Sequence, residues 1–174
     1  MYKRQVVDEL KSKGVIFVDE LSEVPQSSHV IFSAHGVSEK VEKEAEEFNL
    51  LSFDATCPLV TKVHSEVQRH VRAGRDIILI GHEGHPEVEG TLGRHNPMKS
   101  NSKIYLVQDE AEARSLSVSQ PENLAYVTQT TLSIDDTIAI VKILYEQFPK
   151  ILKPKAMIFA MQLKIDRMLL SNLL

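Results

Sequence analysis

The residue of this chain best suited to nucleophilic or metal chemistry is its single cysteine, Cys57, which stands directly before Pro58. Pro58 is typical of the first position of a helix, so Cys57 is expected to cap that helix. A cysteine at a helix N-terminus faces unpaired backbone N–H groups and the positive end of the helix dipole, which favour the thiolate. The thiolate attacks electrophiles and binds metals, and we therefore expect Cys57 to be functional. A small buried packing residue is the alternative.

Two histidines occupy loops of the same kind. His35 precedes Gly36 between an expected strand and an expected helix, and His85 precedes Pro86 in a glycine-bearing loop. Imidazole rings beside free backbone amides suit an anion such as diphosphate, because a protonated ring donates from both nitrogens. Each ring alone would more often be a solvated surface residue, but the equivalent placement of the two supports a shared binding role.

A carboxylate and two hydroxyls complete the candidate site. Glu87 lies two residues beyond His85 and could transfer protons in a cleft that excludes water. Thr130 and Thr131 open the last expected loop and helix, where their hydroxyls could bind a ligand or the amides of the helix itself. Surface exposure for Glu87 and helix capping for the threonines are the alternatives.

The elements that must position these side chains alternate along the chain. Apolar runs predict strands at residues 29–33, 51–53, 77–80, 103–107 and 124–127, and helical spacing predicts helices at about 38–48, 58–73, 109–116 and 133–148. This alternation predicts an α/β fold with open, mostly parallel sheets and flanking helices. Such sheets bind ligands at the carboxyl ends of their strands, where the candidate residues fall.

Composition excludes several classes of protein. The net charge of −4 and the isoelectric point near 6.0 provide no basic surface for a nucleic-acid backbone. No apolar run approaches the roughly 20 residues of a membrane span, and the N-terminus has no signal-peptide pattern. One cysteine cannot form an internal disulfide, which fits a reducing compartment. We expect a cytoplasmic protein with neither a nucleic-acid nor a membrane partner.

Four longer motifs carry a family resemblance. They are F-S-A-H-G-V at 32–37, D-A-T-C-P-L-V-T-K-V-H at 54–64, G-H-E-G-H-P-E-V-E-G-T at 81–91 and T-Q-T-T-L-S-I-D-D-T at 128–137. In this order they closely resemble the 4-hydroxy-3-methylbut-2-enyl diphosphate reductase family (LytB/IspH). The resemblance covers about Val6 to Lys155, roughly the middle half of a typical member.

The resemblance implies a trefoil of three α/β domains around a central cavity, each supplying one cysteine to a [4Fe-4S] cluster. Three thiolates leave one iron free to bind the substrate hydroxyl. Two electrons, from a donor such as ferredoxin or flavodoxin, and two protons then remove that hydroxyl as water. The products are isopentenyl and dimethylallyl diphosphates, in the last step of the non-mevalonate isoprenoid pathway.

The same resemblance implies roles for individual residues. Cys57 is similar to one cluster ligand, and His35 and His85 are similar to the residues that bind the diphosphate of the allylic substrate. Glu87 matches the proton-delivering carboxylate, and Thr130 matches the threonine near the substrate hydroxyl. We also expect Thr131 to bind substrate.

The chain departs from the family pattern at both ends. Residues 1–5 have no family counterpart and match what a transposon-based sequencing adapter would encode. The family's third cysteine motif is missing after Lys155. When permitted codons are chosen for the tail, a shifted reading yields D-D-I-C-Y-A-T, so we hypothesise a frameshifted tail at residues 154–174. A real amphipathic C-terminal helix is the alternative.

These departures define the expected domains and activity. Residues 6–56 would be the remainder of the first α/β domain and residues 57–153 the second. With one of three cluster cysteines, the chain is expected to be an incomplete iron-sulfur oxidoreductase that is inactive alone. A non-catalytic diphosphate-binding α/β domain is the first alternative, and a zinc hydrolase using Cys57, His82 and His85 is the second, although no familiar zinc-ligand spacing supports it.

Overall fold

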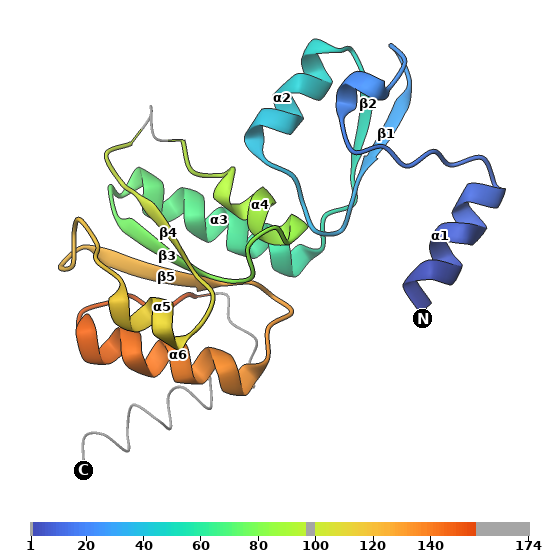
Figure 1. Ribbon diagram of the computed structural model, residues 1–174. Coiled ribbons are helices and arrows are strands. Elements are labelled where there is room, and N and C mark those ends of the chain that lie inside the picture. The colour runs from blue at the N-terminus through green and yellow to red at the C-terminus, as the bar shows by residue number, and fades with distance from the viewer. Residues whose placement is uncertain (1, 97–99, 156–174) are drawn as a thin grey trace.

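The computed structural model describes residues 2–96 and 100–155, with side chains from residue 5 onward (Figure 1). The expected frameshifted tail falls almost entirely outside the described residues. The elements are, in chain order, α1 (Tyr2–Ser12), the 3-10 helix η1 (Leu21–Glu23), β1 (His29–Phe32), α2 (Glu39–Glu47), β2 (Leu51–Asp54), α3 (Pro58–Arg72), β3 (Asp76–Ile80), α4 (Pro86–Leu92), β4 (Ile104–Val107), α5 (Glu110–Ser115), β5 (Leu124–Thr128) and α6 (Ile134–Gln147). All five strands and all four helices expected from the sequence are present, and α1, η1 and α4 are additional.

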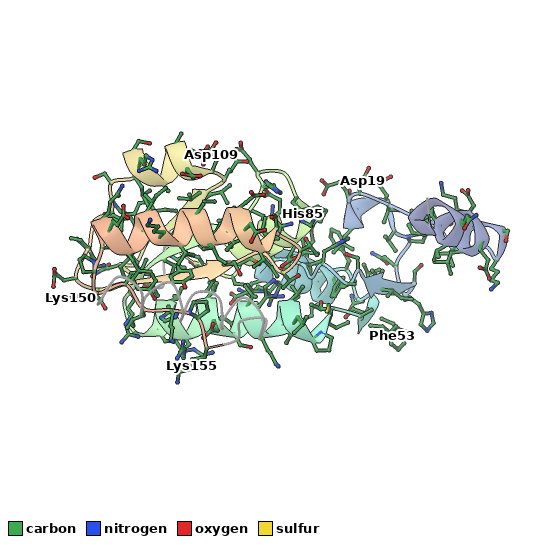
Figure 2. All side chains as sticks on the ribbon, turned by 90° about the horizontal axis from the view of Figure 1, so that it is seen from below. Asp19, Phe53, His85, Asp109, Lys150 and Lys155 are labelled. Carbon is green, nitrogen blue, oxygen red and sulfur yellow. The ribbon has the colours of Figure 1, made fainter. Side chains whose placement is uncertain are left out.

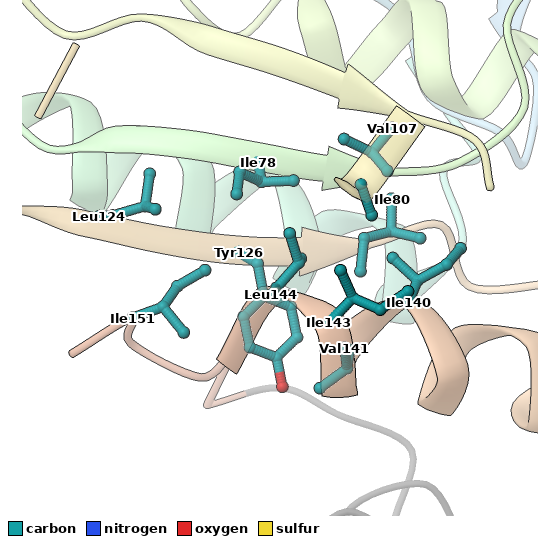
Figure 3. Packing of buried hydrophobic residues seen from close by; sticks show 11 residues of the cluster. Ile78, Ile80, Val107, Leu124, Tyr126, Ile140, Val141, Ile143, Leu144 and Ile151 are labelled. Atoms are coloured by element: carbon teal, nitrogen blue, oxygen red, sulfur yellow. The ribbon is translucent and has the colours of Figure 1, made fainter. Parts of the chain in front are cut away.

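The larger part of the chain, here called the large unit, runs from α3 to α6. Its sheet has the strand order β4-β3-β5, and both pairings are parallel. Strand β3 is fully buried because helices cover both faces of the sheet. Ile77 and Leu79 pack with α3 and α4. Ile78 and Ile80 pack with α5 and α6, in the cluster shown in Figure 3. Because side chains alternate along the strand, β3 contributes residues to two separate cores, one on each face of the sheet.

The preceding part, here called the small unit, comprises η1, β1, α2 and β2. Strands β1 and β2 pair in parallel, with Ile31 opposite Phe53. One face of this sheet packs against α2 and η1 through Leu21, Phe32, Ala45 and Leu50. The other face is open among the described residues: the side chains of Ile31 and Phe53 are 69% and 57% exposed. Figure 2 shows Phe53 projecting from the outer side of the unit.

Local sequence signals account for the starts of three helices. Ser38 accepts a hydrogen bond from Val41 N–H and caps α2, and Ser133 accepts one from Asp136 N–H and caps α6. Cys57 is the N-cap of α3, with Pro58 at the first helical position. These starts were predicted from the sequence and are confirmed.

Helix α4 was not predicted. Its segment is framed and interrupted by Gly84, Gly90 and Gly93, and glycine weakens a helical pattern. The helix nevertheless forms, with Pro86 in its first turn and His85 as its N-cap. Helix α1 is a second addition, over residues for which the sequence suggested no element.

Candidate functional site

The candidate residues lie on connections that leave the carboxyl ends of three strands. The β1–α2 connection carries His35, the β3–α4 connection carries His85, and the β5–α6 connection carries Thr130. Figure 1 shows the connection after β1 reaching the start of α3 and the side of α4. The strand ends of both units therefore face one region, as expected for parallel sheets.

The rings of His35 and His85 meet edge to face. Their centroids are 5.5 Å apart and their planes make an angle of 88°. His35 comes from the small unit and His85 from the large unit, and Figure 2 shows His85 at the boundary between them. The two histidines that the sequence proposed separately are thus one pair that bridges the units.

The tautomer of His85 follows from its capping role. Its Nδ1 accepts a hydrogen bond from the backbone N–H of Glu87 at 3.1 Å. A ring nitrogen that accepts carries no proton, so the neutral His85 ring carries its proton on Nε2. The cap therefore fixes His85 as a hydrogen-bond donor on its outer edge, which is the polarity needed for an anionic ligand.

Glu87 and Thr130 form the second pair of the site. The Glu87 side chain is buried, with 2% exposure. One carboxylate oxygen accepts from Thr130 N–H at 2.6 Å, and the other accepts from Thr130 Oγ1 at 2.9 Å. Glu87 is therefore no surface residue: both its oxygens are directed at Thr130, and a proton can pass between carboxylate and hydroxyl.

Gln129 is a site residue that the sequence reasoning missed. Its side chain is buried; Oε1 accepts from His82 N–H at 3.1 Å, and Nε2 donates to Thr131 Oγ1 at 3.0 Å. The amide thus joins the connection after β3 to the connection after β5. Thr131 is exposed and its hydroxyl contacts the Gln129 amide, whereas the Thr130 hydroxyl contacts Glu87. Gln129 lies within the T-Q-T-T motif, of which only the threonine hydroxyls were predicted to bind a ligand.

Cys57 adjoins the site through the backbone. Its N–H donates to Ala34 O at 2.9 Å, which places the start of α3 beside the residue before His35. Its thiol makes no capping hydrogen bond and is half-buried. The side chain therefore remains free to bind a ligand, while the backbone of Cys57 joins the β2–α3 connection to the β1–α2 connection.

A complete metal site is absent from the described residues. They contain no group of three or more His, Cys, Asp or Glu side chains that could hold a metal ion. The zinc site expected from Cys57, His82 and His85 under the hydrolase alternative is therefore wrong, because these side chains do not converge. A cluster with three thiolate ligands does not fit this chain alone either, because the chain has one cysteine.

His64 is the other residue that the sequence reasoning left without a role, although it ends the D-A-T-C-P-L-V-T-K-V-H motif. Its ring is 5% exposed, and Nε2 has no hydrogen-bond partner among the described residues. Burial lowers the pKa of His64 to about 4, the nearby Arg94 charge also lowers it, and Asp54 partly opposes them. His64 is accordingly neutral at pH 7.

Comparisons of the sequence with known proteins point to one family. The sequence pattern of the family described as LytB protein matches residues 2–165. The 4-hydroxy-3-methylbut-2-enyl diphosphate reductases of Stenotrophomonas maltophilia (strain K279a) and Xanthomonas campestris pv. campestris (strain B100) are each 59% identical over 155 residues, 89% of this chain and 49% of the relative. The chain therefore spans about half the length of the curated relatives it matches.

Solved structures that resemble this chain are also diphosphate reductases. The E-1-hydroxy-2-methyl-but-2-enyl-4-diphosphate reductase from Plasmodium falciparum superposes with a TM-score of 0.80 at 38% identity, over 89% of this chain and 48% of that one. A structure of (E)-4-hydroxy-3-methyl-but-2-enyl diphosphate reductase, the terminal enzyme of the non-mevalonate pathway, gives 0.76 at 28% identity, over 90% and 54%. In the described part of this chain, no helix is long and apolar enough to cross a membrane. With the family pattern matched over almost its entire length, the chain belongs to the LytB protein family.

Proposed function

We propose that this chain forms part of the active site of an iron-sulfur oxidoreductase that removes the hydroxyl group of 4-hydroxy-3-methylbut-2-enyl diphosphate. The observation that carries the proposal is the juxtaposition of two pairs: the His35 and His85 rings, 5.5 Å apart, and the hydrogen-bonded Glu87 and Thr130, with Glu87 following His85 by two residues. One pair is suited to an anion and the other to a proton.

The histidine pair binds the diphosphate. His85 presents Nε2–H, because its Nδ1 is occupied by the helix cap. His35 has Ser33 Oγ 3.4 Å from its own Nδ1, so its Nε2 is likewise left for a ligand. When the Ser33 hydroxyl donates to Nδ1 of His35, Nε2 of that ring carries the proton, and two donors from different units would then bind oxygens of one diphosphate and hold it at the boundary between the units.

Glu87 and Thr130 deliver a proton to the leaving hydroxyl. In the structure Thr130 Oγ1 donates to the Glu87 carboxylate. When Glu87 is protonated the direction reverses: Glu87 donates to Thr130 Oγ1, and the threonine hydroxyl donates onward to the substrate oxygen. In the overall reaction two electrons and two protons enter, the carbon–oxygen bond breaks, a carbon–hydrogen bond forms and water leaves. Isopentenyl and dimethylallyl diphosphates are the products.

The electrons would come from a [4Fe-4S] cluster, itself reduced by a donor such as ferredoxin or flavodoxin. Cys57 would be one ligand, since its thiol is not used for capping and its backbone N–H is bonded to Ala34 O, beside His35. Two further thiolates must come from outside this sequence, which has no second cysteine. We place the reaction in the cytoplasm.

The domain assignment belongs to the same proposal. Residues 6–56 and 57–153 are parts of two of three domains, residues 1–5 derive from a sequencing adapter, and residues 154–174 are a frameshifted tail. Resequencing the source DNA through both ends tests this. A cysteine codon upstream, and another in the shifted frame downstream, are expected; their absence would remove the catalytic assignment for this gene product.

The reaction is tested with the gene product extended according to that resequencing. After anaerobic reconstitution it should bind iron and sulfide and convert 4-hydroxy-3-methylbut-2-enyl diphosphate to the two products, and Glu87→Gln should lower kcat by at least about 100-fold. An extended protein that binds a cluster without turnover would refute the proposed reaction. The 174-residue chain should not retain a cluster, so full iron and sulfide content in it would refute the ligand assignment.

The non-catalytic diphosphate-binding domain remains the second candidate, favoured by the histidine pair alone. Calorimetry of the extended protein with pyrophosphate, before and after cluster loading, separates the two. The binding domain is supported if Cys57→Ala binds pyrophosphate as tightly as the wild type and the wild-type protein with its cluster shows no turnover.

A further inference from the structure

The small and large units meet along one narrow strip, here called the seam. On one side lies the end of the β1–α2 connection, Gly36 to Ser38, and on the other lie Gly90 of α4 and Gly93, which directly follows that helix. A Cβ atom added to Gly90 would lie 3.0 Å from Gly36 O, and one added to Gly93 would lie 2.1 Å from the Ser38 Cβ. A Cβ atom at Gly93 would overlap Ser38, and one at Gly90 would displace Gly36 O by a few tenths of an ångström, so the backbones of the two units approach closely at these glycines.

The other side of the same connection is held by α3. A Cβ atom on Gly36 would lie 2.5 Å from His64 Cε1 and 3.2 Å from Thr56 Cγ2. Gly36 also has a φ of 76°, which other residues rarely adopt. The Gly36 peptide is thus confined between the His64 ring on α3 and Gly90 on α4.

Polar contacts close the outer end of the seam. Arg94 donates to Val37 O at 2.6 Å and forms a two-point ion pair with Glu42 of α2, at 2.7 and 2.9 Å. The backbone N–H of Glu39 donates to Gly93 O at 3.3 Å. These hydrogen bonds hold residues 37–42 against the end of α4, in addition to the packing of Gly36 between α3 and α4.

The seam lies next to the histidine pair on both sides. His35 is the residue before Gly36, and His85 caps the helix that carries Gly90. Any displacement of Gly36 relative to α4 therefore moves one ring relative to the other. We propose that Gly36, His64 and Gly90 are positioning residues: their close packing sets the spacing of the His35 and His85 rings and thereby the affinity of the site for a diphosphate. This inference rests on the proposed function only in its choice of ligand.

Gly90→Ala is the sharpest test, because its two expected effects have opposite signs. Alanine is the better helix former, so a purely structural change within α4 would leave the protein equally or more stable. An alanine methyl against Gly36 O must instead displace the connection. We expect the dissociation constant for pyrophosphate, measured by calorimetry, to rise about tenfold. The nuclear Overhauser effect between His35 and His85 ring protons should also weaken, without a fall in Tm.

Lys142→Ala, on the exposed side of α6 and across the sheet from α4, is the control and should leave affinity and ring contact unchanged. A second pair of variants removes dependence on one substitution. His64→Ala opens space behind Gly36 and should reproduce the loss, whereas His64→Phe keeps a ring against Gly36 and should retain wild-type affinity. Such rescue by shape is expected of a positioning residue and not of a ligand-binding imidazole.

The outcomes separate the two proposals. Unchanged affinity and an unchanged ring contact in both Gly90→Ala and His64→Ala would overturn the positioning role. If the extended wild-type protein does not bind pyrophosphate but the ring contact weakens in these variants, the positioning role stands and the diphosphate assignment fails. Loss of affinity in His64→Phe equal to that in His64→Ala would also overturn the inference, because it would make the His64 nitrogens the active groups.

Discussion

The two sheets of this molecule are built alike but supported differently. In the large unit, helices cover both faces of a parallel sheet and β3 is fully buried. In the small unit, one face of the β1–β2 sheet packs on α2, and the opposite face leaves Ile31, Leu51 and Phe53 exposed in the described structure. Parallel sheets are normally covered on both faces, so the small unit obtains less stabilisation from its own core.

This difference bears directly on the candidate site. Glu87, Thr130 and His85 belong to the well-buried unit, whereas His35 belongs to the less buried one. The histidine pair therefore depends on the seam, while the Glu87–Thr130 pair depends only on the core of the large unit. The predictions below test that division.

The largest effect should come from a matched pair of leucines. Leu144 is fully buried in the large unit, and Leu51 is 53% exposed on the open face of the small unit. Leu144→Ala should lower the free energy of unfolding by about 2–5 kcal/mol, because it leaves a cavity, and Leu51→Ala should change it by less than about 0.5 kcal/mol. Urea denaturation measures both. Similar losses at the two positions would contradict the difference in support.

Acidification should destabilise the fold through two buried histidines. Burial lowers the pKa of His70, as it does that of His64, to about 4, and the Arg69 charge adds to the effect. The unfolded chain takes up protons near pH 6.5 and the folded chain does not, so stability falls from pH 6.5 to 4 and levels off below it. Allowing for solvent screening, we expect a loss of about 1–2 kcal/mol for each ring.

Denaturation midpoints at pH 7 and pH 4.5 check this expectation. His70→Phe should reduce the pH dependence of the stability of the large unit. His64→Phe should reduce the pH dependence of the stability of the contacts at the seam. A wild-type midpoint that is constant between these pH values would show that neither ring resists protonation in the folded state.

Arg94→Lys should loosen the seam selectively. Lysine cannot make the two-point pair with Glu42 while also donating to Val37 O, so we expect a loss of about 1–2 kcal/mol in the local stability of the small unit. Hydrogen exchange should become faster for amides of α2 and β1 and remain unchanged for β3. Faster exchange of β3 amides would mean that the two units unfold together and are not separately supported.

The smallest effect is expected on the open face. Phe53→Ser removes an exposed ring that stacks on His29 at 5.9 Å, and it should change the free energy of unfolding by less than about 0.5 kcal/mol. It should nevertheless reduce self-association, measured by light scattering against protein concentration, because the open apolar face becomes smaller. A loss of stability comparable to that of Leu144→Ala would show that this face packs against something within the chain.

Local signals in the sequence were enough to predict most elements and the common edge on which the site lies. Ser38, Cys57 and Ser133 each mark a helix start within a few residues, and parallel strands bring their connections to one edge. Helix α4 was missed because Gly90 and Gly93 serve the seam, and a glycine chosen for a distant contact resembles a helix breaker when read locally.

The missed side chains have the same cause. Gln129 contacts His82, 47 residues earlier, and His64 packs on Gly36, 28 residues earlier, so neither role is visible in a window of neighbouring residues. The edge-to-face contact of His35 with His85 also depends on how two units dock. Sequence motifs named these two histidines as a set, but only the structure gives their separation.

The seam has a consequence for how units of this kind could be exchanged. Apart from the His64 ring and the ion pair of Arg94 with Glu42, it is made of glycines and of backbone carbonyl and amide groups. A chimera that joins residues 5–56 of this chain to the corresponding large unit of a relative would need two glycines, one arginine and a ring at position 64 to restore the histidine spacing. The Gln68 side chain of α3 also donates to Glu39 of α2 at 3.2 Å, so this pair would have to be kept or exchanged together, whereas side chains away from the boundary could diverge independently.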